Sequence, residues 1–80
     1  MLNMAFAQVL RRLRQEKKFS QEKFAFEAGL HRTYVSQLER GLKSPSLETM
    51  GQIAKVLGIK LSALMKMVEV APRGASAKRR

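Results

Sequence analysis

The sequence predicts an all-α fold in which five short helices share one small core. Apolar residues recur at spacings of three and four along most of the chain, as they do on one face of a helix. No stretch alternates between apolar and polar residues over enough positions for a convincing strand. The two prolines and five glycines stand where helices should end. Because a chain of 80 residues can build only a limited core, we expect a single domain.

The first predicted helix covers residues 4–17. Phe6, Leu10 and Leu13 fall on one face of it, together with the aliphatic stem of Lys17. We expect this face to contact the core.

The second predicted helix begins after Ser20, whose hydroxyl can cap its first turn. Phe24, Ala25 and Ala28 are its apolar residues. Gly29 follows as a natural stop, because glycine readily adopts the left-handed conformation that ends many helices.

The third predicted helix is HRTYVSQLER, residues 31–40, and Gly41 ends it. Two helices joined by a short turn can cross steeply only if the residue at their contact is small, as Ala25 is. Val35 and Leu38 would then pack on the second helix. The opposite, polar face is either the solvated side of an amphipathic helix or a surface for binding a partner. It carries four residues: Arg32, Thr33, Ser36 and Gln37.

Residues 42–46 predict a loop before the fourth helix, with Ser46 as the favoured cap and Ser44–Pro45 as an alternative start. This helix should end before Gly58, and its expected inward residues are Leu47, Met50, Ile53, Ala54 and Leu57. Ser62 is the expected cap of the last helix, whose expected inward residues are Leu61, Leu64, Met65 and Val68. We expect residues 1–70 to form the domain and residues 71–80, which are small and basic from Pro72 onward, to form a disordered tail.

The composition predicts a polyanionic partner. Sixteen Lys and Arg against six Asp and Glu give a net charge of +10, which favours nucleic acid first and an anionic membrane surface second. The absence of cysteine makes a reducing, cytoplasmic setting the default, and one histidine leaves too few ligands for a structural zinc, so no cofactor is expected. The apolar opening MLNMAFAQVL is too short to span a bilayer and has its arginines on the wrong side for a signal peptide, so we expect a soluble protein.

Several motifs together resemble the Cro and lambda-repressor-like family of helix-turn-helix proteins, the XRE-type regulators, over about residues 5–65. They are LRRLR at 10–14, FSQEKFA at 19–25, TYVSQLERG at 33–41, and SPSLETM followed by AKVLGI. HRTYVSQLERG is especially similar to the small controller proteins of restriction–modification systems. The resemblance implies a five-helix lambda-repressor-like domain whose second and third helices form the helix-turn-helix. It also implies a transcription regulator that reads double-stranded DNA.

The resemblance further assigns roles to individual residues. The implied base-reading residues are Arg32, Thr33, Ser36 and Gln37. The implied phosphate-binding residues are Gln21, Arg40, Lys43 and Ser44, although Gln21 could instead be a plain polar residue in the first helical turn and the others merely solvated. Arg14 and Glu39 match an ion pair that ties the first helix to the recognition helix in relatives. Two positions depart from the family: Lys18, where relatives often have glycine, and His31, where they often have a capping Ser, Thr or Asp.

Relatives usually bind palindromic sites as two-fold dimers, so we expect a homodimer. Ile59, Met67 and Val70 lie off the main apolar stripe of the last helix and are the candidate interface, unless a small core simply encloses them. RNA polymerase or another protein is a further candidate partner, and repression is the default mode of regulation. The competing function is that of an antitoxin-like module that neutralises a partner protein and regulates itself. The sequence shows no arrangement of catalytic residues, so we do not expect an enzyme.

Overall fold

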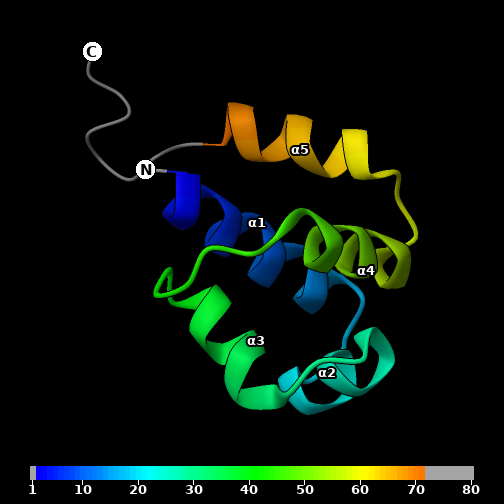
Figure 1. Ribbon diagram of the computed structural model, residues 1–80. Coiled ribbons are helices and arrows are strands. Elements are labelled where there is room, and N and C mark those ends of the chain that lie inside the picture. Colours follow the sequence, from blue (N-terminus) through cyan, green and yellow to red (C-terminus); the bar gives the residue numbers. More distant parts are fainter. Residues whose placement is uncertain (1, 72–80) are drawn as a thin grey trace.

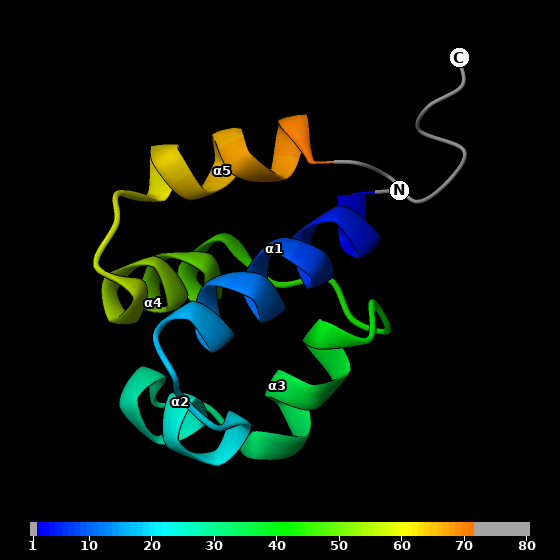
Figure 2. The same ribbon diagram turned by 180° about the vertical axis from the view of Figure 1, so that it is seen from behind.

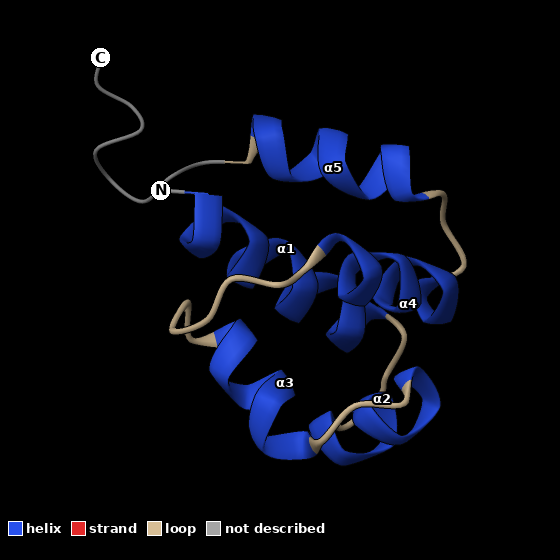
Figure 3. Cartoon of the chain, viewed as in Figure 1, coloured by secondary structure: helices blue, strands red, loops and turns tan. Residues whose placement is uncertain are grey.

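Five helices and no strand make up residues 2–71, the part of the chain that the computed structural model describes. They are α1 (Leu2–Glu16), α2 (Gln21–Ala28), α3 (Arg32–Glu39), α4 (Leu47–Leu57) and α5 (Leu61–Val70) (Figure 1, Figure 3). The predicted all-α fold is therefore confirmed. The expected tail from Pro72 onward lies outside the described residues.

The helices form two groups around one core. α5 packs on α1 and α4, whereas α2 and α3 pack on each other at the opposite end of the molecule, as the front and back views both show (Figure 1, Figure 2). α3 also packs on α1, and α2 on α4. The longest helix, α1, therefore connects the two groups and fixes the position of α3.

The first helix differs from its prediction at both ends. It begins at Leu2 rather than at residue 4, and it ends at Glu16. Lys17 is exposed, so the prediction that its stem contacts the core is wrong. The physical reason is that the chain leaves the helix there and turns through Lys18, which has a φ of 61°.

The predicted ends of α2 are confirmed. The Ser20 hydroxyl accepts a hydrogen bond of 3.0 Å from the N–H of Lys23. Gly29 ends the helix with a φ of 72°, and Leu30 N–H then donates to Ala25 O at 2.8 Å. This tight end lets the chain turn at once toward α3.

Ser46 caps α4 as predicted, accepting a bond of 3.0 Å from Thr49 N–H, so the alternative start at Ser44–Pro45 is wrong. Leu47 was expected to face inward, yet 68% of its surface is exposed. It is the first residue of α4, and the side of the helix that enters the core carries Ile53, Ala54 and Leu57.

The predicted cap of α5 is wrong. The helix begins at Leu61, and Lys60 occupies the cap position without a side-chain hydrogen bond. Gly58 ends α4 in the left-handed conformation, and Lys60 is extended, so the next residue already starts the helix. Ser62 therefore lies inside the first turn, and it is exposed.

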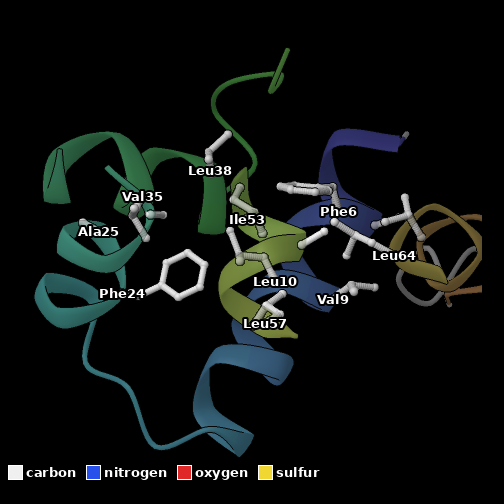
Figure 4. Packing of buried hydrophobic residues seen from close by; sticks show 14 residues of the cluster. Phe6, Val9, Leu10, Phe24, Ala25, Val35, Leu38, Ile53, Leu57 and Leu64 are labelled. Carbon is white, nitrogen blue, oxygen red and sulfur yellow. The ribbon is translucent and has the colours of Figure 1, made fainter. Parts of the chain in front are cut away.

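The core connects all five helices (Figure 4). Its largest fully buried side chains are Phe24, Leu10, Leu38, Ile53, Leu64, Val9 and Val35. Met50 and Met65, expected to face inward, are only partly buried. Because α3 contributes Val35 and Leu38 to this core, its orientation is set by packing.

None of the helices in residues 2–71 has the length and apolar character that a bilayer span requires.

Candidate nucleic-acid interface

The third helix divides cleanly into a buried and an outward face. Val35 and Leu38 are completely buried, and Figure 4 shows both pointing into the core. Arg32 and Thr33 are exposed, and Ser36 and Gln37 are half-buried. The four predicted base-reading residues therefore lie on one accessible side of a helix whose other side is fixed by packing.

The crossing of α2 and α3 has the geometry that the sequence predicts. Ala25 is 2% exposed at the α2 end of the shared core, close to Val35 of α3 in Figure 4. A small residue here lets the two backbones approach closely. Gly29 supplies the left-handed turn between the helices. Residues 21–39 thus form a helix-turn-helix.

The start of α3 has no side-chain cap. His31 holds the N-cap position with extended backbone (φ −83°, ψ 144°), but its imidazole makes no capping hydrogen bond. The first N–H groups of a helix have no partner within the helix, so in α3 they stay available to an incoming acceptor. The departure from the family pattern at His31 leaves the helix start at Arg32 and leaves its N-terminal end open.

A buried polar cluster joins α1, α2 and α3 behind this surface. Arg14 donates from Nε to Glu39 Oε2 at 2.5 Å and from Nη2 to Glu39 Oε1 at 3.0 Å. Its third nitrogen, Nη1, donates to the backbone carbonyl of Phe19 at 2.7 Å. The two charged side chains are only 10% and 3% exposed. The expected ion pair is present, and it connects the end of the recognition helix to α1.

Gln21 belongs to the same cluster, a contact that sequence reasoning missed. Its amide Nε2 donates to Glu39 Oε1 at 3.1 Å. Gln21 is the first residue of α2 and is half-buried. The sequence placed Gln21 and Glu39 separately, and nothing in their spacing of 18 residues signals that the fold brings them into contact.

The loop after α3 carries the other expected phosphate ligands. Arg40 is the C-cap residue of α3, and Gly41 then adopts a left-handed φ of 74°. Arg40, Lys43 and Ser44 are all exposed. Within residues 2–71, none of the ion pairs involves Arg32, Arg40 or Lys43, so these three charges are not neutralised by the described part of the protein.

The candidate dimer residues do not lie in one environment. Ile59 and Met67 are partly buried and pack against the core. Val70, near the end of α5, is 71% exposed.

An outward polar helix, an open helix start and unpaired cationic side chains around them define a helix-turn-helix DNA-binding domain. Comparison with known proteins gives the same class, since the pattern of a helix-turn-helix family matches residues 10–64. The chain belongs to this family. It is a transcription regulator of the XRE and Cro-like kind and not an enzyme, and the resemblance seen in the sequence is confirmed.

Similar proteins include small controllers. The chain is 40% identical over 70 residues to the control protein C.BamHI of Bacillus amyloliquefaciens, covering 86% of each chain. Among solved structures, the restriction-modification controller protein C.AhdI from Aeromonas hydrophila is similar with a TM-score of 0.75 and 42% identity, over 78% of this chain and 94% of that one. The clp gene regulator ClgR from Corynebacterium glutamicum is similar with a TM-score of 0.81 and 26% identity, over 86% and 73% of the two chains.

Proposed function

We propose that this protein is a sequence-specific repressor that binds a palindromic operator as a homodimer, with α3 of each protomer in the major groove. The observation that carries the proposal is the division of α3, because burial of Val35 and Leu38 holds the helix so that Arg32 and Gln37 face outward. An α-helix fits the major groove of B-DNA, and the N-terminal residues of a recognition helix read the base edges there.

The residue types on this face suit base reading. Arg32 can bond guanine through O6 and N7, and Gln37 can bond adenine through N6 and N7. The methyl group of Thr33 can contact the methyl group of thymine, and the Ser36 hydroxyl can donate or accept. Each good bidentate contact contributes about 1–3 kcal/mol of discrimination against the wrong base.

Phosphate contacts would flank the reading helix. Gln21 stands at the N-terminus of α2, where backbone N–H groups and the helix dipole favour an anion. Its bond to Glu39 uses one amide N–H, which leaves the second N–H for a phosphate oxygen. Arg40, Lys43 and Ser44 would hold the phosphates beyond the other end of α3. Such contacts fix the register of the protein on DNA but carry no sequence information themselves.

Two protomers would read two half-sites about 10 bp apart, one turn of B-DNA. The exposed Val70, with Ile59 and Met67 behind it, is the candidate surface between protomers. A two-fold interface uses the same patch on both chains, so a small apolar patch near the end of α5 is sufficient to define it.

The similarity to C.BamHI and C.AhdI supports a controller role in a restriction–modification system, in the cytoplasm, with the concentration of the protein setting operator occupancy. Repression by blocking the promoter needs no further partner, whereas activation would need a contact with RNA polymerase.

Footprinting of the DNA upstream of the gene that encodes this chain tests the proposal. The expected result is a protected region with two-fold symmetry, in which phosphates on one face of the duplex are shielded. Uniform coating without a boundary would contradict it, because non-specific binding follows charge and not sequence.

A further inference from the structure

The turn between α1 and α2 contains a backbone conformation that its residue type does not favour. Lys18 has a φ of 61°, and within residues 2–71 it is the only residue other than glycine with a positive φ. The other three left-handed positions are Gly29, Gly41 and Gly58. An L-residue in this region crowds its Cβ against the backbone, whereas glycine does not. Glycine would thus be the more stable choice at position 18, which raises the question of what the lysine side chain contributes.

The turn is held firmly in place relative to the recognition helix. Lys18 N–H donates to Gln15 O at 2.9 Å, and Phe19 N–H donates to Arg14 O at 3.2 Å. Arg14 Nη1 bonds the carbonyl of Phe19 at 2.7 Å, and the same guanidinium bonds Glu39 at the end of α3. The Cα of Lys18 is therefore a fixed point beside the N-terminal end of α2, where Ser20 caps the helix and Gln21 begins it.

The charge on Lys18 has no partner within the protein. Its side chain is exposed, and no ion pair or side-chain hydrogen bond involves it in residues 2–71. Its neighbour Lys17 is also exposed, but the Lys17 Nζ lies 3.6 Å from the position that a Cβ on Gly58 would occupy. Lys17 is thus directed to the C-terminal end of α4, where the helix dipole favours a cation. The two adjacent lysines have different surroundings.

We propose that Lys18 is a DNA phosphate ligand, on the phosphate run that the N-terminus of α2 faces. This inference rests on the proposed function. A lysine is suited to the role because its ammonium is a point charge on a flexible stem and reaches a phosphate without a fixed geometry. The strained turn keeps a cation at a site where glycine would stabilise the fold but would add nothing to DNA binding.

Lys18→Gly tests the proposal without risk of unfolding, because glycine relieves the strain. The measurements are thermal unfolding of the free protein and binding to an operator duplex recovered by selection from a random library, over a series of salt concentrations. We expect the melting temperature to rise, the Kd at 150 mM salt to increase about three- to fivefold, and the salt slope of log K to become shallower by about 0.9. Lys18→Arg should retain the wild-type slope.

Lys17→Ala is the matched control, since it removes the same charge one residue away. It should change the slope by much less than Lys18→Gly. The proposal is overturned if Lys18→Gly leaves the Kd and the slope unchanged, or if both variants weaken binding equally, which would mean that only the overall charge matters. If the wild-type protein itself selects no duplex, the proposed function fails instead.

Discussion

Glu39, the last residue of the recognition helix, receives two hydrogen bonds from Arg14 of α1, at 2.5 and 3.0 Å, with both side chains almost completely buried. The carboxylate also accepts a bond from Gln21 of α2. One buried group therefore contacts the helix that supports the recognition helix and the helix that precedes it. The orientation of α3 depends on this group as well as on apolar packing.

Removing the carboxylate should strongly destabilise the fold. Glu39→Ala leaves the Arg14 guanidinium buried without a counter-charge, and we expect the free energy of unfolding to fall by about 3–5 kcal/mol. Urea denaturation followed by circular dichroism measures this. Glu27→Ala is the control, because the Lys23–Glu27 pair of 3.2 Å is largely exposed, and such pairs contribute about 0–1 kcal/mol. A loss for Glu39→Ala no larger than that of the control would contradict the account.

Replacing both partners of the buried pair should cost less than replacing one. Arg14→Met with Glu39→Leu removes the two charges together, so no uncompensated charge remains in the interior. We expect the double variant to recover most of the stability that Glu39→Ala loses in the same denaturation experiment. A double variant as unstable as the single one would show that the geometry of the cluster, including its bonds to Phe19 and Gln21, matters more than charge compensation.

The base-reading and phosphate-binding roles predict different losses. Arg32→Ala should lower the preference for one base pair, by about 1–3 kcal/mol, while binding to random DNA changes little. Lys43→Ala should weaken binding to every sequence alike and reduce the salt slope by about one. Fluorescence anisotropy with operator and scrambled duplexes at several salt concentrations distinguishes these patterns. Equal losses on both duplexes for both variants would refute the assigned roles.

Two glycines should respond to alanine in opposite ways. Gly51 lies inside α4, and a Cβ added there would meet nothing within 4 Å, so Gly51→Ala should stabilise the protein by about 0.5–1 kcal/mol. Gly41 has a φ of 74°, and a Cβ there would collide with the sulfur of Met4, so Gly41→Ala should destabilise it. Denaturation midpoints measure both effects. A stabilising Gly41→Ala would mean that the chain leaves α3 differently.

The dimer surface can be tested on α5. Val70→Asp places a charge on a residue that is already exposed in the monomer, so the stability of the monomer should change little. If Val70 lies between protomers, the dimer should dissociate at a much higher fraction of protein at equal concentration, as measured by sedimentation equilibrium. Phe26→Asp is the control, since Phe26 of α2 is even more exposed, at 79%. A wild-type dimer unaffected by Val70→Asp would place the interface elsewhere.

Local signals in the sequence were reliable where the chemistry is local. Ser20, Ser46 and Gly29 act on the backbone of their own turns, and each was predicted correctly. Ser62 was wrong because the left-handed end of α4 at Gly58 already fixes where α5 starts. A capping residue in sequence cannot reveal that a preceding turn has pre-empted it.

Contacts through space were harder to predict. The Arg14–Glu39 pair came from resemblance to a family, whereas the third member of the cluster, Gln21, did not. Helical periodicity also failed at the ends of elements, where Lys17 and Leu47 continue an apolar pattern but the chain has left or only just entered the helix. Position within the helix, rather than residue type, decides burial there.

The most direct test of the central claim, that this helix-turn-helix reads DNA sequence as a dimer, is selection of bound sites from a random duplex library at about 150 mM salt, which suppresses purely electrostatic binding. The account predicts a two-fold palindrome whose half-sites are centred about 10 bp apart. Recovery of no common motif would contradict it, and would mean that the net charge of +10 binds nucleic acid without reading it or that the true partner is a protein.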